Sequence, residues 1–294
     1  MRMCQVNVLN NDGITINKRG INNLIFGFKA WLFENLSPLG VRVNFQFLNP
    51  YYIIGDMYLS VIIPAYNEEK HIKNTVEDIY RYLSGRSITH EIIVVVNGST
   101  DKTAEIVKGL LPTIQTVKLI SLPAGGKGFA VKEGMLKATG DFRLFTDADN
   151  ATTINHIEKM LPYFDQGYDV VIGSIAVPGS TVASGSEPFW RRILGKLGNL
   201  FIQIMAVPGI HDTQRGFKIV TAQAAKDIFP RITIARWGFD IEMLALARKF
   251  KHKIKEVPVN WKNDPNSHVR LSAYIEVLLE TIRVRLNLMT GKYK

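Results

Sequence analysis

Short apolar runs alternate with segments of helical periodicity from residue 57 onward. The runs that predict β-strands are 59–63, 91–96, 116–121, 169–173 and a run from Phe142 that ends at Thr146; those that predict helices are about 68–83, 101–110 and 128–138. The run 91–96 is apolar at every position after Glu91, which is typical of a strand buried on both faces of a parallel sheet. The alternation predicts an α/β fold with a doubly wound, mostly parallel sheet and flanking helices.

Two later segments have the spacing of amphipathic helices, namely 190–207 and the stretch from Leu271 to Met289. A helix that packs one face on the protein core shows the same pattern, so core packing is the ordinary interpretation. Both segments also carry aromatic and basic residues, which makes contact with a membrane surface the alternative.

Residues 1–56 differ from the rest, with an Asn-rich opening and then apolar residues at helical spacing between Ile21 and Leu36. We expect 1–56 to be an N-terminal appendage of uncertain order and 57–294 to be the folded domain. Within that domain, we expect a nucleotide-binding half at about 57–150 and an acceptor half at about 151–294.

The formal net charge of +10 suits partners that carry phosphate or an anionic membrane surface. The basic run at 248–255 has few interleaved aromatic residues and matches no nucleic-acid motif, so we predict lipid headgroups rather than nucleic acid as its partner. Cys4 is the single cysteine, which excludes a disulfide within the chain and fits a reducing compartment. The sequence has no run of about 18 apolar residues, so we predict no transmembrane helix, and its beginning is a poor match to a signal peptide.

Polar motifs follow the first two predicted strands, at the strand ends where ligands bind in such sheets. Pro64-Ala-Tyr-Asn-Glu-Glu69 offers Tyr66 to stack on a base, and Asn67 and Glu68 to bond base or ribose. A helix N-cap is the alternative for this motif. Asn97-Gly-Ser-Thr-Asp101 fits either a ligand contact or a glycine turn followed by a cap.

A glycine-rich segment, Gly125-Gly-Lys-Gly128, opens the third predicted helix. Its backbone N–H groups and the charge of Lys127 suit a phosphate, because a helix N-terminus favours anions. The segment is neither a Walker loop nor a dinucleotide fingerprint, and a plain flexible loop explains it equally well.

Two carboxylates, Asp147 and Asp149, follow the strand that ends at Thr146. A turn there can bring both together, and oxygen ligands suit Mg²⁺ or Mn²⁺. A metal ion bridging a diphosphate would neutralise the charge on a departing nucleotide. An EF-hand is excluded, because the required loop does not follow.

Two further motifs lie in the second half. His211-Asp-Thr-Gln-Arg-Gly-Phe-Lys218 gathers Arg and Lys, which suit phosphate recognition, although a solvated surface turn is the alternative. In Arg236-Trp-Gly-Phe-Asp-Ile-Glu242, the two acidic residues either cap the next helix or place Asp240 against a sugar.

Together the six motifs resemble, in order, those of family 2 glycosyltransferases with the GT-A fold, and the resemblance covers roughly 57–290. The last two motifs and the closing Val259-Asn-Trp261 look like the dolichyl-phosphate β-glucosyltransferase branch. The resemblance implies an inverting hexosyltransferase that moves glucose from UDP-glucose to a dolichyl or other polyprenyl phosphate. It also implies a peripheral position on the cytoplasmic face of a membrane, with the helix at 190–207 resting on the lipid.

Motifs and resemblance together assign a role to each candidate residue. The nucleotide-sugar would be bound by Pro64, Tyr66, Glu68, Asn97, Asp101, Lys127, Asp147 and Gln214. The catalytic residues would be Asp149, Asp240, Arg215 and Lys218, of which the resemblance places Arg215 and Lys218, with Gln214, near the diphosphate and the acceptor phosphate. Asp147 and Asp149 would hold Mg²⁺ or Mn²⁺.

Two features depart from the family pattern. Val96-Asn97 replaces the usual acidic pair, and Arg215 stands where a small residue is expected. Ala151 occupies a position where the mannosyl branch tends to have Gln, which favours glucosyl over mannosyl transfer.

Attack by a phosphate oxygen needs no strong general base, so positioning and charge stabilisation would lower most of the barrier. The alternatives are a polyprenyl-phosphate mannosyltransferase that uses GDP-mannose, and a transferase acting on a glycan hydroxyl, for which Asp240 is the obvious base. A sugar-nucleotidyltransferase is disfavoured, because its Gly-rich, Arg-containing signature is not seen after the first strand. A non-catalytic nucleotide-sugar binder is favoured by Asn97 and disfavoured by the intact Asp147 and Asp149.

Overall fold

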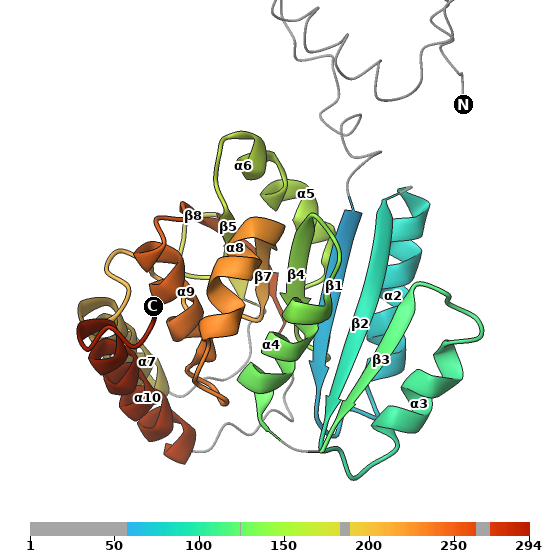
Figure 1. Ribbon diagram of the computed structural model, residues 1–294, viewed down its shortest axis with the longest axis horizontal. Coiled ribbons are helices and arrows are strands. Elements are labelled where there is room, and N and C mark those ends of the chain that lie inside the picture. Colours follow the sequence, from blue (N-terminus) through green and yellow to red (C-terminus); the bar gives the residue numbers. More distant parts are fainter. Residues whose placement is uncertain (1–57, 87, 124, 183–188, 263–270) are drawn as a thin grey trace, which may run out of the picture. The chain divides into compact units, whose positions relative to one another are not determined.

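The computed structural model describes residues 58–294 except 87, 124, 183–188 and 263–270. The predicted appendage at 1–56 lies outside the described residues. In the described part, helices surround a central sheet (Figure 1).

The central sheet has seven strands in the order β3-β2-β1-β4-β7-β5-β8. They are β1 (Tyr58–Ala65), β2 (Thr89–Asn97), β3 (Val117–Leu122), β4 (Phe142–Thr146), β5 (Val170–Ser174), β7 (Phe217–Thr221) and β8 (Ile254–Pro258). Strand β7 runs antiparallel to both of its neighbours, whereas the other pairings are parallel. Strands β6 (Thr181–Val182) and β9 (Asn260–Trp261) form a separate pair. The predicted mostly parallel, doubly wound sheet is confirmed.

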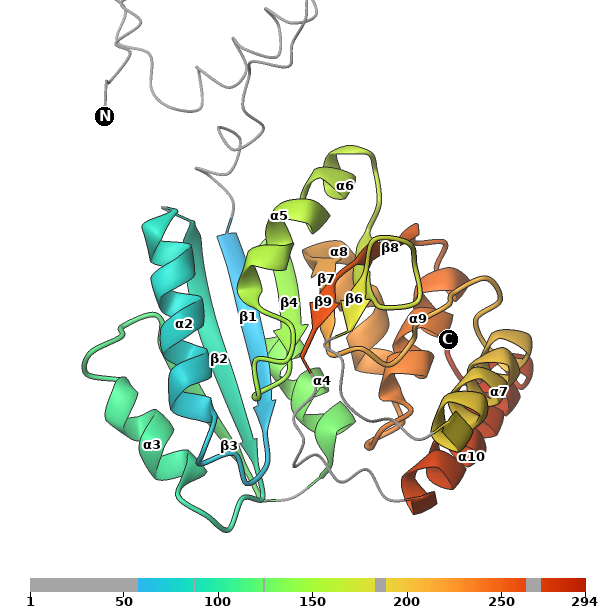
Figure 2. The ribbon, with the colours of Figure 1, turned by 180° about the vertical axis from the view of Figure 1, so that it is seen from behind.

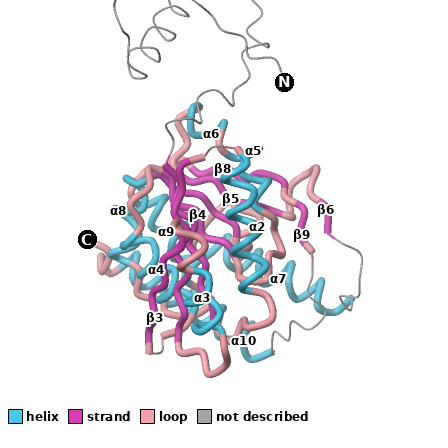
Figure 3. Tube along the Cα trace, turned by 90° about the vertical axis from the view of Figure 1, so that its right-hand side faces the viewer, coloured by secondary structure: helices cyan, strands magenta, loops and turns pink. Residues whose placement is uncertain are grey.

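Helices cover both faces of the sheet, as the side view in Figure 3 and the view from behind in Figure 2 show. The helices are α2 (Ile72–Gly85), α3 (Thr103–Leu110), α4 (Lys127–Lys137), α5 (Ile157–Met160), α6 (Pro162–Asp165), α7 (Phe189–Met205), α8 (Ala222–Ile228), α9 (Phe239–Lys249) and α10 (Leu271–Met289). Short 3-10 helices span Ile154–His156 and Phe229–Arg231.

Alternation along β1 divides the interior into two hydrophobic cores. Ile62 packs in the core that includes side chains of α4, α8 and α9, whereas Val61 and Ile63 pack with those of α2 and α3. Successive side chains of a strand point to opposite faces, so an unbroken apolar run fills both cores at once.

The observed elements differ from the sequence predictions in several places. Helix α2 begins at Ile72 rather than near 68, because the residues after β1 form a turn bonded to the loop after β2. Strands β7 and β8 were not predicted, and both lie on the side of β4 away from β1. The basic run at 248–255 is divided between the end of α9, a turn and β8, so it does not form one continuous basic face of a single element.

Helices α7 and α10 lie side by side at the edge of the described domain (Figures 1 and 2). Ile202 of α7 and Val284 of α10 are buried, which bears out core packing for one face of each helix. Other apolar side chains of both helices are exposed, so core packing does not account for their whole surface. Among the described helices, none is long and apolar enough to cross a bilayer.

Candidate active site

The turn after β1 is bonded to the loop after β2. Asn67 donates its backbone N–H to Ser99 Oγ (3.0 Å), and its side-chain Oδ1 accepts the backbone N–H of Thr100 (2.8 Å). Asn67 has a φ of 55°, a left-handed conformation that Asn tolerates better than most residues. The N-cap position of α2 belongs to His71, so Asn67 joins two loops instead of capping the helix.

Asp101 strengthens the same junction. Its carboxylate accepts the backbone N–H groups of Glu69 (3.1 Å) and Thr103 (3.0 Å). Burial raises the pKa of Asp101, but the hydrogen bonds from Thr103 and Glu69 outweigh it and leave the pKa below its usual value. The two loops form a fixed support beside Tyr66, a residue that is 62% exposed. An exposed ring at this position is free to stack on a base.

Asn97, at the end of β2, is 6% exposed, and its side-chain Oδ1 has no hydrogen-bond partner among the described residues. A buried polar atom without a partner is costly and calls for an explanation. A ligand group that donates to this oxygen is one explanation, in keeping with the role predicted for Asn97. Pro64, by contrast, is buried within β1.

Lys127 opens α4 and is ion-paired with Asp147, whose Oδ1 lies 2.6 Å from Lys127 Nζ. Burial lowers the pKa of Lys127, but the neighbouring carboxylates of Asp147 and Asp240 outweigh it and raise the pKa overall. The cation therefore persists at neutral pH. The Lys127 charge and the N-terminus of α4 thus lie together at the carboxyl end of β4. Both features favour binding of an anion such as a diphosphate.

Gly216 lies directly against Asp147. The backbone N–H of Asp147 donates to the carbonyl of Gly216 (3.1 Å), and Phe217 pairs with Thr146 where β7 meets β4. A Cβ at residue 216 would lie 2.1 Å from Asp147 Oδ2. Glycine is therefore the residue that leaves space for this carboxylate.

Asp149 lies in the same electrostatic environment as Asp147 and Glu68. Burial raises the pKa of Asp149, and the charge of Asp147 raises it further. Burial also raises the pKa of Glu68, with additional contributions from Asp149 and Asp147. The charges of nearby carboxylates thus contribute to the raised pKa of both Asp149 and Glu68, and a bound cation would relieve that repulsion.

The donor chemistry of Asp147 and Asp149 fits Mg²⁺ or Mn²⁺. Mg²⁺ in proteins is usually bound through one or two carboxylates, and substrate phosphates and water complete its shell. No group of three or more His, Cys, Asp or Glu suited to a metal occurs among the described residues. The two carboxylates fit a cation whose remaining ligands come from a bound diphosphate and water.

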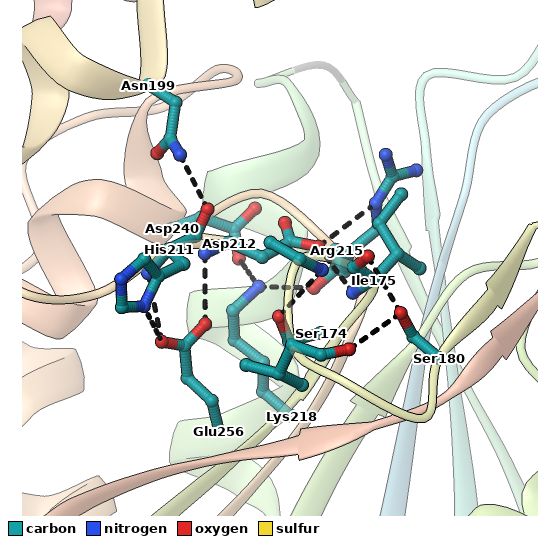
Figure 4. A network of polar contacts seen from close by, with 12 residues as sticks. Ser174, Ile175, Ser180, Asn199, His211, Asp212, Arg215, Lys218, Asp240 and Glu256 are labelled. Atoms are coloured by element: carbon teal, nitrogen blue, oxygen red, sulfur yellow. Dashed lines mark hydrogen bonds and ion pairs between the residues drawn. The ribbon is translucent and has the colours of Figure 1, made fainter. Parts of the chain in front are cut away.

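The segment that begins at His211 is anchored by β8 (Figure 4). Glu256 accepts the backbone N–H groups of His211 (2.9 Å) and Asp212 (3.0 Å). Asp212 Oδ2 accepts the backbone N–H of Ile175 (2.9 Å) and lies 3.4 Å from Arg215 Nε. Several charges of this segment are thus paired within the fold, which disfavours the alternative of a solvated surface turn.

Lys218 and Asp240 form a buried ion pair (Figure 4), with 2.6 Å between Nζ and Oδ1. Lys218 Nζ also donates to the carbonyl of Arg215 and lies 5.1 Å from the centroid of the Phe145 ring. Burial raises the pKa of Asp240, and the Lys218 charge opposes that rise. Lys218 is completely buried, so in this arrangement its charge acts on Asp240 and does not face solvent.

Arg215 remains partly accessible and packs on Trp261. Its guanidinium carbon lies 4.3 Å from the centroid of the Trp261 ring, and 28% of its side chain is exposed. Lys262 donates its backbone N–H to the carbonyl oxygen of Ala151. Ala151 donates its own backbone N–H to Asp149 Oδ1 (3.0 Å). These contacts join β9 to the turn that carries Asp149. Of Arg215 and Lys218, Arg215 is therefore the one that stays partly accessible, and the side chain of Gln214 beside it is exposed.

The acidic residues of α9 do not cap that helix. Helix α9 begins at Phe239 with Gly238 as its N-cap, and Asp240 turns inward to Lys218. Glu242 is fully buried and accepts the backbone N–H groups of Thr233 and Ile234 (both 2.8 Å). The predicted capping alternative is wrong, because both carboxylates serve partners distant from the helix terminus.

Trp237 is a residue that sequence reasoning missed as a site candidate. It is 43% exposed, and Lys127 Nζ lies 5.7 Å from the centroid of its ring. Ala235, two residues earlier, accepts the N–H of Phe129 (3.1 Å), which fixes this turn against α4. The signal available in the sequence was an aromatic residue within a motif already singled out.

Comparison with known sequences gives a consistent picture. A profile of the family described as Glycosyl transferase family 2 matches residues 60–229. A dolichyl-phosphate beta-glucosyltransferase from Dictyostelium discoideum is 36% identical over 256 residues, which cover 82% of this chain and 78% of that protein. The protein of the same name from Homo sapiens is 31% identical over 252 residues, covering 80% and 77%.

Comparison with solved structures supports the fold. Glucosyl-3-phosphoglycerate synthase from Mycobacterium tuberculosis, in complex with Mn²⁺, UDP and phosphoglyceric acid, has a TM-score of 0.61 at 18% identity and covers 84% of both chains. Mannosyl-3-phosphoglycerate synthase from Rubrobacter xylanophilus has a TM-score of 0.56 at 17% identity, covering 80% of this chain and 75% of that one. At this identity the likeness bears on the fold alone, and it agrees with the predicted fold class.

Proposed function

The chain belongs to glycosyltransferase family 2, and we propose that it transfers glucose from UDP-glucose to a dolichyl or other polyprenyl phosphate. The observation that carries the proposal is the contact of Asp147 with both Lys127 and Gly216, beside Asp149. It gathers a cation, a helix N-terminus and two carboxylates where a nucleotide diphosphate would lie. The glucose and the lipid phosphate are supported by the names of the relatives.

We propose a single in-line displacement with inversion. An anionic oxygen of the lipid phosphate attacks the anomeric carbon, the new carbon–oxygen bond forms, and the bond to the diphosphate breaks with release of UDP. Asp147 and Asp149 would hold Mg²⁺ or Mn²⁺, which would neutralise charge on the diphosphate. Arg215 would orient the attacking phosphate, and Lys127 would stabilise the departing diphosphate.

The state of Asp240 favours a phosphate acceptor over a glycan hydroxyl. A hydroxyl needs a general base, and Asp240 was the candidate that the sequence offered for it. Asp240 is 2% exposed and ion-paired with Lys218, so reaching a substrate hydroxyl would require breaking that pair. A phosphate oxygen is already anionic at neutral pH and needs no such base.

We also propose a peripheral position on the cytoplasmic face of a membrane. Exposed apolar residues on α7 and α10, such as Ile204 and Leu279, support contact with lipid. The single cysteine is compatible with a reducing compartment.

A donor screen tests the proposal. Purified protein, Mg²⁺ or Mn²⁺ and a polyprenyl phosphate are incubated with UDP-glucose, GDP-mannose or other nucleotide-sugars, and transfer to the lipid is followed. We expect transfer from UDP-glucose. Transfer from GDP-mannose alone would replace the proposed donor, and absence of transfer by folded protein with every donor would favour a binding role.

A further inference from the structure

The outer surface of α10 carries a continuous apolar stripe. Five of its residues are between 38% and 69% exposed: Ile275, Leu279, Ile282, Leu286 and Met289. At 3.6 residues per turn these five fall within an arc of about 80°. Val277 and Val284, on the opposite side, are buried. The stripe is therefore the face of α10 that packs on no described part of the protein core.

Basic residues border this stripe on both sides. Arg283 and Arg285 are exposed, and helical geometry places them about 80° to either side of its centre. Helix α7 packs beside α10 and adds exposed Leu197, Leu200 and Ile204. An apolar stripe between cations is the pattern of a helix that lies in the surface of an anionic bilayer. Apolar patches of this extent are uncommon on the surface of a monomeric protein unless they bind something.

The inner side of α10 contacts the turn before α9. Glu280 Oε2 accepts the backbone N–H of Gly238 at 2.7 Å, and a Cβ on Gly238 would lie 2.8 Å from Glu280 Cβ. The carboxylate also faces the positive end of α9, since Gly238 is its N-cap residue. Glu276, one turn earlier, lies 3.4 Å from Arg236 Nη2. A displacement of α10 would therefore be transmitted to the turn.

The same turn reaches the candidate donor site. Trp237 lies between the two α10 contacts in sequence, and the Lys127 Nζ is 5.7 Å from its ring centroid. Lys127 in turn pairs with Asp147 at 2.6 Å. The contacts thus run without a break from Glu280 through Gly238 and Trp237 to the cation of the donor site.

We infer that α10 couples contact with an anionic phospholipid bilayer to the donor site through Glu280 and the turn 236–238. The bilayer receives the stripe Ile275–Met289 and its flanking arginines, and the Glu280–Gly238 contact sets the position of Trp237. This inference rests on the proposed function, in which the acceptor is a lipid. Vesicle binding and the response of Trp237 can nevertheless be measured without glucosyl transfer.

Tryptophan fluorescence tests the coupling without substrates. The chain contains four Trp residues, so the Trp237 signal is the difference between wild type and Trp237→Phe. Vesicles of phosphatidylcholine with phosphatidylserine are added, and binding is measured in parallel by co-sedimentation. We expect the vesicles to bind the protein and to shift the Trp237 emission, and vesicles of phosphatidylcholine alone to do so less.

Three variants separate docking from coupling. Ile275→Glu combined with Leu279→Glu should lose both vesicle binding and the emission shift, whereas the control Leu136→Glu, an exposed apolar position on α4, should lose neither. Glu280→Ala should bind vesicles as wild type does but lose the shift. Glu280→Gln, which keeps an oxygen to accept the Gly238 N–H, should restore it.

Several outcomes would overturn the inference. An unchanged Trp237 emission shift in Glu280→Ala would refute the coupling through Glu280. Failure of the wild-type protein to bind anionic vesicles would refute the bilayer as the partner of the stripe. Self-association without lipid that the Ile275→Glu, Leu279→Glu double variant abolishes would assign the stripe to a second copy instead. Failure of the donor screen with an intact vesicle response would reject the proposed reaction and leave the coupling standing.

Discussion

The carboxylate of Asp147 occupies the space that a side chain at Gly216 would fill, with 2.1 Å between Oδ2 and the position of a Cβ. The two residues are 69 positions apart and meet because β7 pairs with β4 in antiparallel register. The Asp147 carboxylate of one predicted motif can therefore take its position only because another predicted motif has a glycine at residue 216.

Substitution of Gly216 by Ala should displace Asp147 and lower kcat by about a hundredfold, the order expected when a catalytic group moves by about 1 Å. Steady-state kinetics of glucosyl transfer measure the effect, and thermal unfolding checks the fold. The matched control is Gly109→Ala on α3, where an added Cβ meets nothing within 4 Å. Equal activity in Gly216→Ala and Gly109→Ala would contradict the role given to this contact.

Replacing Asp149 by Asn should abolish metal-dependent transfer and leave the fold intact, because the amide lacks the charge that holds a divalent cation. Calorimetric titration of Mn²⁺ into the protein in the presence of UDP measures the loss of metal binding directly. The exposed Asp165→Asn is the control and should behave as wild type. Retained activity in Asp149→Asn would refute the metal assignment.

Substitution of Lys218 by Met should destabilise the protein by about 3–5 kcal/mol, because it leaves the Asp240 carboxylate buried without its partner. Urea denaturation measures the free energy of unfolding. The double variant Lys218→Met, Asp240→Leu removes both charges and should recover most of that stability. If Lys218→Met instead kept full stability and lost only acceptor binding, a direct phosphate contact would be the better explanation.

Glu91 should make the protein sensitive to acid. Burial raises the pKa of Glu91, but hydrogen bonds from Lys118, Ser60 and Thr139 outweigh it and hold the folded-state pKa below 4.5, the usual value for a glutamate. The folded state then binds fewer protons than the unfolded state in the window below pH 4.5. The stabilisation is fully present above that pH and is lost as the pH falls through the folded pKa.

Denaturant unfolding between neutral pH and pH 3 or so measures this contribution. Glu91→Gln should be less stable than wild type at neutral pH, and the difference should narrow as the pH falls. The exposed Glu105→Gln on α3 is the control and should follow the wild-type curve. A constant gap between Glu91→Gln and wild type across this range would exclude the linkage.

Local pattern was sufficient for the parallel half of the fold and for the position of the motifs. The apolar run 91–96 predicts a doubly buried strand wherever it occurs, and polar residues that follow such strands gather at one edge of the sheet. The motifs containing Asp147 and Lys127 were therefore found from the sequence, as was the likeness to the family.

Pattern was insufficient where a residue's role depends on its partner. Lys218 and Arg215 are both cations of one motif, yet one is completely buried against Asp240 and the other stays partly exposed against Trp261. Apolar and polar residues alternate too weakly along β7 for this strand to be recognised from the sequence alone. Its antiparallel pairing with β4 and β5 places Lys218 in the interior, whereas Arg215 precedes the strand.

Fold class, family and the order of the site motifs follow from the amino-acid sequence alone, because they depend on local periodicity and on short polar segments at strand ends. The contacts by which Gly216 makes room for Asp147 and Glu280 holds the turn beside Trp237 exist only in the folded chain. Such contacts join residues far apart in the chain, and their distances depend on how strands register and helices pack, which no single segment encodes.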